Sequence, residues 1–174
     1  MITVIMDLES TCWEKRTDPK EQEIIEIGAV KLDTSFETVD EFDRFVRPKE
    51  NPALSKFCQE LTHISQKDID KAGTFDVVFP AFLNWIGESA YSIASWGDFD
   101  IKHIKIDCKR HAVSFPKRFE KKHLNVKALF AQKRRIRPCG MTQALQMMNI
   151  PLEGTHHRGI DDARNIVKIF RTLM

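Results

Sequence analysis

Residues 2–8, Ile-Thr-Val-Ile-Met-Asp-Leu (ITVIMDL), decide the fold class of this 174-residue chain. Their first five residues are all apolar or β-branched, which is typical of a buried strand. Two further strand-like segments follow at residues 23–32 (EIIEIGAVKL) and 41–46 (EFDRFV). Only residues 33–40 separate these two segments, so we expect them to be antiparallel neighbours. The three segments together predict a meander at the start of a sheet.

Helical patterns alternate with short strands in the rest of the chain. Apolar residues recur at helical spacing within residues 75–86 and again within 161–173. Further helices are expected at 53–61, after the Ser-x-x-Asp capping box at 65–68, at 100–112 and at 141–148, and strands at 90–96 and 124–126. This order predicts an α/β fold, with a mixed central sheet flanked by helices. We find no internal repeat or domain boundary and expect residues 1–174 to form a single domain.

The composition excludes several classes of protein. Hydrophobic residues make up 42% and charged residues 30% of the chain, which excludes a disordered protein. No stretch approaches the ~20 apolar residues of a membrane span, so we expect no membrane association. The four cysteines stand singly at positions 12, 58, 108 and 139. This pattern argues against a zinc site or a disulfide framework and predicts reduced thiols in the cytoplasm.

Charge is distributed unevenly along the chain, although the net charge is only +2. Residues 1–51 hold 7 Lys/Arg and 13 Asp/Glu, whereas residues 102–137 hold 13 Lys/Arg and 2 Asp/Glu. Such a basic block predicts contact with a polyanion, because Lys and Arg release condensed counterions from phosphates. The alternative is a solvated basic face. The side chains expected to guide a phosphate backbone are Lys117, Arg118, Lys121, Lys122, Lys133, Arg134, Arg135 and Arg137.

Acidic residues follow two of the predicted strands. Asp7 and Glu9 lie at the end of the first strand, and residues two apart on a strand face the same side. Both carboxylates can therefore point at one spot. Asp98 and Asp100 come directly after the strand at 90–96, and either of them can instead cap the helix that follows.

A third group of polar residues, His156, His157, Asp161 and Asp162, opens the last predicted helix. Acids at a helix N-terminus are favoured by the helix dipole alone, and paired histidines usually lie on the surface. Taken with the other two sites, however, the group completes a set of acids at the ends of separate elements, with a histidine nearby. Oxygen ligands of this kind suit Mg²⁺ or Mn²⁺ rather than zinc, and two such ions can promote hydrolysis of a phosphodiester.

These motifs resemble those of the DEDD-type 3′–5′ exonucleases, in the subclass that has a histidine in its third motif (DEDDh). The first motif, Asp-x-Glu, matches residues 7–9. The second, an aromatic residue followed by Asp, matches Phe99-Asp100 and selects Asp100 over Asp98. The third, His-x₄-Asp, matches His157 and Asp162. Flanking residues 7–12, 23–28, 95–100 and 158–163 are similar to the Eri1/KapD-like branch, and the likeness covers residues 2–173.

The resemblance implies a ribonuclease H-like fold and a role for each motif residue. Asp7, Glu9, Asp100 and Asp162 would hold two Mg²⁺ or Mn²⁺ ions, and His157 would accept the proton of the attacking water. Residues implied to bind the 3′ end are Leu8, Ser10, Thr11, Leu61, His63 and Phe99. For Leu61 and Phe99 the alternative is ordinary core packing.

The implied activity is metal-dependent 3′–5′ exonuclease cleavage of single-stranded nucleic acid, with RNA favoured over DNA and nucleoside monophosphates released. The alternative is a non-processive proofreading or nucleic-acid-binding subunit that acts with a polymerase or another partner chain. Relatives specialised for very short oligonucleotides usually have tyrosine in place of the third-motif histidine, so His157 argues against that substrate. The sequence leaves open a protein partner or a homodimer.

Overall fold

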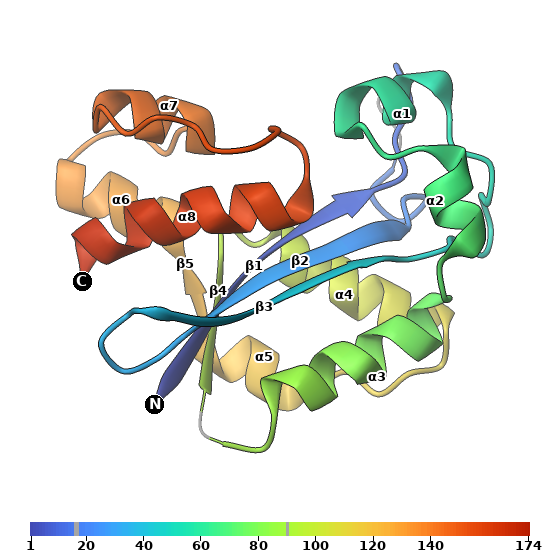
Figure 1. Ribbon diagram of the computed structural model, residues 1–174, viewed down its shortest axis with the longest axis horizontal. Coiled ribbons are helices and arrows are strands. Elements are labelled where there is room, and N and C mark those ends of the chain that lie inside the picture. Colours follow the sequence, from blue (N-terminus) through green and yellow to red (C-terminus); the bar gives the residue numbers. More distant parts are fainter. Residues whose placement is uncertain (16–17, 90) are drawn as a thin grey trace.

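A five-stranded mixed sheet forms the centre of the molecule (Figure 1). The computed structural model describes residues 1–15, 18–89 and 91–174. The strands are β1 (Ile2–Ser10), β2 (Ile24–Leu32), β3 (Thr38–Phe45), β4 (Tyr91–Ser95) and β5 (His123–Asn125). Their order in the sheet is β3-β2-β1-β4-β5, with β1, β2 and β3 antiparallel and with β4 parallel to both β1 and β5. The predicted mixed sheet with three antiparallel first strands is therefore confirmed.

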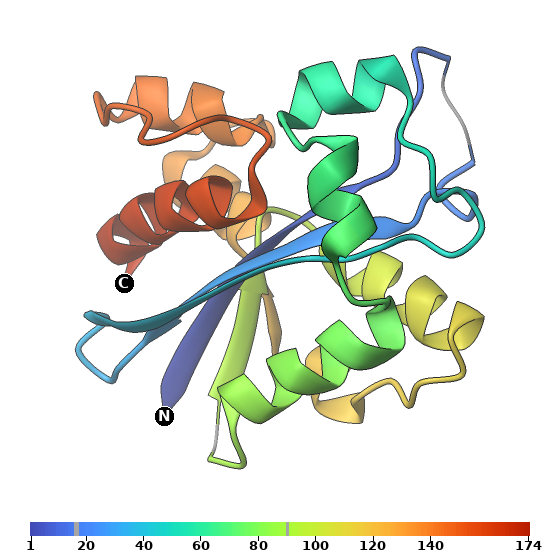
Figure 2. The same ribbon diagram turned by 45° about the vertical axis from the view of Figure 1, so that its right-hand side comes forward.

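Helices cover both faces of this sheet (Figures 1 and 2). One face packs against α3 (Phe75–Ile86), α4 (Phe99–Arg110) and α5 (Lys117–Lys122). The other face packs against α6 (Val126–Arg134), α7 (Met141–Met147) and α8 (Gly159–Leu173). Two short helices, α1 (Lys56–Thr62) and α2 (Gln66–Lys71), lie beside the end of β1. None of the helices in the described part of the chain has the length and apolar character needed to span a membrane.

Successive side chains of β1 alternate between the two faces of the sheet, and this alternation places Asp7 and Glu9. Val4 and Met6 pack toward α3, α4 and α5, whereas Ile5 packs toward α6, α7 and α8. Because successive side chains on a strand point to opposite faces, Asp7 and Glu9 share the face of Ile5. Both carboxylates thus project toward α8.

The N-terminus of α8 is held unusually close to β2. A Cβ atom on Gly28 would lie 2.1 Å from the carbonyl carbon of Gly159 and 2.1 Å from the nitrogen of Ile160. A Cβ atom on Gly159 would in turn lie 3.0 Å from the carbonyl oxygen of Asp7. Only glycine at position 28 permits this contact, which places the first turns of α8 directly over β1 and β2.

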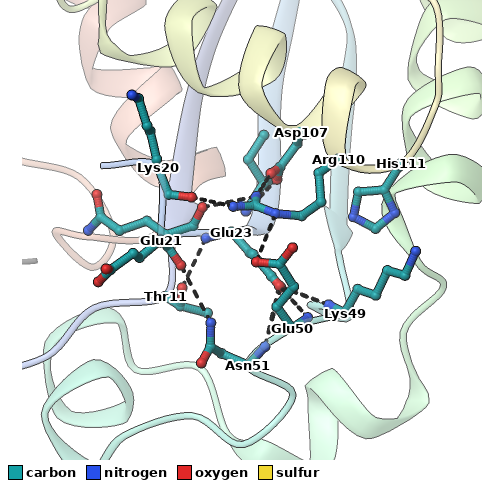
Figure 3. Close-up of polar contacts among 12 residues, drawn as sticks. Thr11, Lys20, Glu21, Glu23, Lys49, Glu50, Asn51, Asp107, Arg110 and His111 are labelled. Atoms are coloured by element: carbon teal, nitrogen blue, oxygen red, sulfur yellow. Dashed lines mark hydrogen bonds and ion pairs between the residues drawn. The ribbon is translucent and has the colours of Figure 1, made fainter. Parts of the chain in front are cut away.

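A buried polar network fixes the segment between β1 and β2 (Figure 3). The Asp107 carboxylate accepts a hydrogen bond from the backbone nitrogen of Ile24 at 2.8 Å and forms an ion pair with Arg110. Burial raises the pKa of Asp107 to about 6. The Glu23 carboxylate accepts backbone hydrogen bonds from Lys49 at 2.8 Å and from Glu50 at 2.7 Å. Together these contacts tie α4 and the loop after β3 to the start of β2.

Some predicted boundaries differ from those of the structure. The strand expected at 124–126 is β5, and its last expected residue, Val126, instead begins α6 because the Asn125 side chain caps that helix by accepting from the Ala128 nitrogen at 2.9 Å. Ala90, the first residue of the strand expected at 90–96, lies outside the described residues. Helix α3 has the predicted limits even though Pro80 lies inside it.

Candidate active site

The four acids of the three motifs meet at the C-terminal end of β1. Ligand oxygens of Asp7, Glu9 and Asp162 all lie within 4.8 Å of one another. Asp100, in the first turn of α4, accepts a hydrogen bond from the backbone nitrogen of Leu8 at 3.1 Å. Leu8 lies between Asp7 and Glu9, so Asp100 is held beside the same short piece of strand. Elements far apart in the sequence thus supply carboxylates to one place.

Burial and mutual repulsion make this cluster electrostatically unfavourable by itself. Burial is the largest cause that raises the pKa of Asp7 and of Glu9, the latter to about 9, and the neighbouring carboxylates raise both pKa values further. Burial also raises the pKa of Asp100 to about 6 and raises that of Asp162. Within the described residues, no lysine or arginine forms an ion pair with any of these four acids. A dense set of hard oxygen donors that no lysine or arginine pairs with is the donor set that a divalent cation fits.

The structure also distinguishes the two acids that follow β4. Asp98 is the N-terminal flanking residue of α4, and its side chain is 55% exposed. Its carboxylate accepts a hydrogen bond from Asn125 Nδ2 at 3.0 Å and does not join the cluster at the end of β1. Asp100, in contrast, is only 4% exposed and contacts β1. The geometry therefore favours Asp100 over Asp98 as the acid of the second motif.

Two stacked histidines border the acid cluster. The ring centroids of His156 and His157 are 3.9 Å apart, and His156 Nδ1 lies 3.0 Å from Asp162 Oδ2. The backbone nitrogen of His157 donates to the same oxygen at 3.1 Å. Burial, and next the neighbouring His156, lower the pKa of His157. Both imidazoles line the cavity described next, and both can reach a group bound there.

A cavity of 390 Å³ opens over the acids. Four of the residues expected to bind substrate line it: Leu8, Ser10, Leu61 and Phe99. The Phe99 ring is 43% exposed and stacks on the buried ring of His103, with centroids 4.4 Å apart. The remaining wall includes Trp96, which lies in the family-like segment 95–100. It also includes Gly140, Met141, Thr142 and Gln22, which carry no motif by which sequence reasoning could have found them.

Thr11 and His63 are the two expected substrate-binding residues that do not line the cavity. Thr11 is 2% exposed, and its hydroxyl accepts a hydrogen bond from the Glu23 nitrogen at 3.0 Å. His63 is an exposed residue in the left-handed conformation at the C-terminus of α1, with φ 57°. Neither side chain is among those that line the cavity.

Glu26 is a supporting residue that sequence reasoning missed. Its carboxylate, on β2, is fully buried and accepts hydrogen bonds from Arg158 Nε at 3.2 Å and from the Gly159 nitrogen at 3.0 Å. Burial raises the pKa of Glu26 to about 7, although the Arg158 and Gly159 hydrogen bonds oppose that rise. The contact fixes the turn that carries His157 to the sheet. A glutamate inside an otherwise apolar strand (EIIEIG) was the available signal, because a buried charge needs a partner.

A ribonuclease H-like sheet that carries a four-carboxylate centre, of which three members are buried, with an adjacent histidine defines a nuclease of the DEDDh class. The sequence profile of the exonuclease family (RNase_T) matches residues 4–170, and the chain belongs to this family. The resemblance seen in the motifs is thereby confirmed, and membership of the DEDDh group implies dependence on divalent metal ions.

Individual relatives agree with this assignment. The chain is 33% identical to human ERI1 exoribonuclease 2 over 185 residues, which covers 93% of this chain and 27% of the relative. It is 31% identical to the Drosophila melanogaster 3′–5′ exonuclease Snipper, covering 94% of this chain and 66% of that protein. The chain thus spans between about a quarter and two thirds of the length of these relatives. The crystal structure of the nuclease domain of 3′hExo, a DEDDh family member, bound to rAMP, superposes with a TM-score of 0.92 at 31% identity, covering 98% of this chain and 90% of that chain.

Proposed function

We propose that residues 1–174 form a single catalytic domain that hydrolyses single-stranded RNA, in preference to DNA, from its 3′ end and releases nucleoside monophosphates. The observation that carries this proposal is the convergence of Asp7, Glu9 and Asp162 at an open cavity, with Asp100 hydrogen-bonded to the strand that carries the first two. The direction of cleavage and the preference for RNA draw support from relatives that are named 3′–5′ exonucleases or exoribonucleases, and from the rAMP bound in a similar structure.

The four carboxylates are proposed to hold two Mg²⁺ or Mn²⁺ ions. Asp7, Glu9 and Asp162 would be ligands from one group of nearby oxygens, and Asp100, which is hydrogen-bonded to the Leu8 nitrogen next to Asp7, would complete the set. When bound, such ions activate water and offset the negative charge of a phosphodiester. Their charge would also relieve the repulsion among the buried acids.

His157 is proposed to take the proton from the attacking water. It lines the cavity, its backbone is fixed through Asp162, and the Glu26–Arg158 contact holds the turn that carries it. Leu8, Leu61 and Phe99 form an apolar wall suited to a terminal nucleoside, and base stacking on an aromatic ring contributes about 1–3 kcal/mol. Ser10 supplies a polar group on the same wall. The contributions of Thr11 and His63 stay predictions from the family resemblance.

Digestion of matched RNA and DNA strands labelled at the 5′ end tests the proposal. With Mg²⁺ or Mn²⁺, we expect a ladder that shortens from the 3′ end, faster for RNA, and no shortening when a chelator is present. Asp100→Asn should abolish the ladder, whereas the matched variant Asp98→Asn should retain it because Asp98 lies outside the cluster. Full activity of Asp100→Asn, or metal-independent shortening, would refute the proposed centre.

A further inference from the structure

Two groups of exposed basic residues within the block at 102–137 lie at different places in the structure. The first is the α5 surface, formed by Lys117, Lys121 and Lys122, which are all exposed. Lys122 shares a hollow with Met1 and Ser92, at the beginning of β1 and β4. The cavity, in contrast, lies beside residues 7–10 at the other end of β1. At about 3.3 Å per residue, these two places are roughly 20 Å or more apart along the strand.

The second surface is the α6–α7 surface, formed by Arg134, Arg135 and Arg137. The segment that carries these residues continues directly into the cavity wall, which Gly140, Met141 and Thr142 help to form. From Arg137 to Gly140 the chain can span at most about 11 Å. The backbone of Arg137 therefore lies within about 11 Å of the cavity wall, and Arg134 and Arg135 precede it in the same continuous segment.

The α6–α7 segment is fixed in place rather than loosely attached. Trp96, itself a residue of the cavity wall, donates from Nε1 to the carbonyl oxygen of Cys139 at 3.1 Å. The Ile136 nitrogen donates to the Ala131 carbonyl oxygen at 3.0 Å, and the Ile136 side chain packs against the core under α6, α7 and α8. A fixed backbone keeps the arginines in a constant position relative to the cavity.

The guanidinium groups of this surface have no acidic partner in the described part of the chain, and that of Arg134 lies over the Phe130 ring, 5.9 Å from its centroid. Arg134, Arg135 and Arg137 are exposed, and within the described residues none of the three forms an ion pair. Lys127, on α6, adds a positive charge beside Gly97, because its Nζ would lie 3.5 Å from a Cβ atom there. The planar fork of an arginine matches the geometry of a phosphate group, which makes arginine well suited to hold a nucleic-acid backbone.

We propose that Arg134, Arg135 and Arg137 bind the backbone phosphates of a single strand upstream of the nucleotide that occupies the cavity, and that the α5 surface takes no part. This inference rests on the proposed function, since it assumes that a 3′-terminal nucleotide enters the cavity. It narrows the expectation that eight basic side chains between residues 117 and 137 guide the phosphate backbone.

Two variants of equal charge test this path. The first replaces the three arginines of the α6–α7 surface (Arg134→Gln, Arg135→Gln, Arg137→Gln), and the control replaces three lysines of the α5 surface (Lys117→Gln, Lys121→Gln, Lys122→Gln). Binding of a fluorescent 12-nucleotide RNA is measured with chelator present, at several salt concentrations. Each single-strand phosphate contact contributes about 0.7 to the logarithmic salt slope, so loss of three should reduce the slope by about 2 and weaken binding about 10- to 100-fold at ~0.1 M salt.

The control variant should keep the wild-type slope. With Mg²⁺ or Mn²⁺, the arginine variant should lose kcat/KM on the 12-nucleotide strand but retain it on a dinucleotide, which has no upstream phosphate. The proposal would be wrong if wild type and the arginine variant showed the same salt dependence of binding. It would also be wrong if the arginine and lysine variants lost the same amount of affinity. An inactive wild-type enzyme would instead refute the proposed function, and the chelator binding measurement would still report on the surface.

Discussion

Replacement of Gly28 by alanine should impair both the stability and the activity of this chain. The added methyl group would lie 2.1 Å from backbone atoms of Gly159 and Ile160, where ordinary contacts are 3.4–4 Å. Backbone cannot rotate away as a flexible side chain does, so α8 must move outward by roughly 1 Å. Overpacking of this kind costs about 1–3 kcal/mol, and we expect a value near 3 kcal/mol because both contacts are with backbone.

The expected change in melting temperature follows from that energy. For a chain of this length, 1 kcal/mol corresponds to about 2–4 °C, so Gly28→Ala should melt about 6–12 °C below wild type. Activity should fall as well, because α8 carries Asp162 and the preceding turn carries His157. A misplacement of about 1 Å can reduce a rate by about 100-fold.

Thermal melts followed by circular dichroism and exonuclease rates at 20 °C would measure the two effects. Gly140→Ala is the control for stability, because a Cβ atom there meets no heavy atom within 4 Å. A melting temperature within about 2 °C of wild type together with an unchanged rate would show that the Gly28–Gly159 contact does not position α8.

Three further predictions concern single side chains. Burial lowers the pKa of His103 to about 4, so the folded protein binds a proton at His103 less readily than the unfolded chain does. The folded state is therefore fully stable above pH ~6.5 with respect to this group, and it loses stability as the pH falls toward 4. Relative to His103→Phe, wild type should lose about 2 kcal/mol of unfolding free energy between pH 7.5 and 5 in urea titrations, and parallel pH profiles would contradict this. His157→Ala should lower kcat by about 10²–10⁴-fold and His156→Ala by less, while the reverse order would assign the base to His156. Phe99→Ala should raise KM for RNA by about 5- to 150-fold with a smaller change in kcat, and an unaltered KM would place Phe99 outside the substrate contacts.

Local patterns in the sequence were sufficient to predict the strand that carries the site. Alternation along residues 2–8 predicts that Asp7 and Glu9 share one face, which agrees with the structure because the side-chain period of a strand is independent of the rest of the fold. Helix α3 was equally predictable, since its apolar repeat buries Phe75, Phe79 and Phe82 on one side.

Other features depend on contacts between distant residues and had no local signal. Helix α5 has six residues, of which only Phe119 is buried, so no apolar repeat marks it. The Glu26–Arg158 contact joins residues 132 positions apart. Thr11 is a candidate for substrate contact from the family resemblance, but in the structure its hydroxyl accepts a hydrogen bond from the Glu23 nitrogen. Spacing along the chain does not reveal such partners, because tertiary packing brings them together.

The acid cluster draws on both β1 and α8, which are separated by most of the sequence. During synthesis on the ribosome, β1 emerges long before α8, and the chain at that stage lacks Asp162 and the adjoining histidines. A partly synthesised chain therefore lacks one of the four acids and both histidines of the proposed centre. The same separation means that loss of α8 by proteolysis would inactivate the protein even with β1 intact.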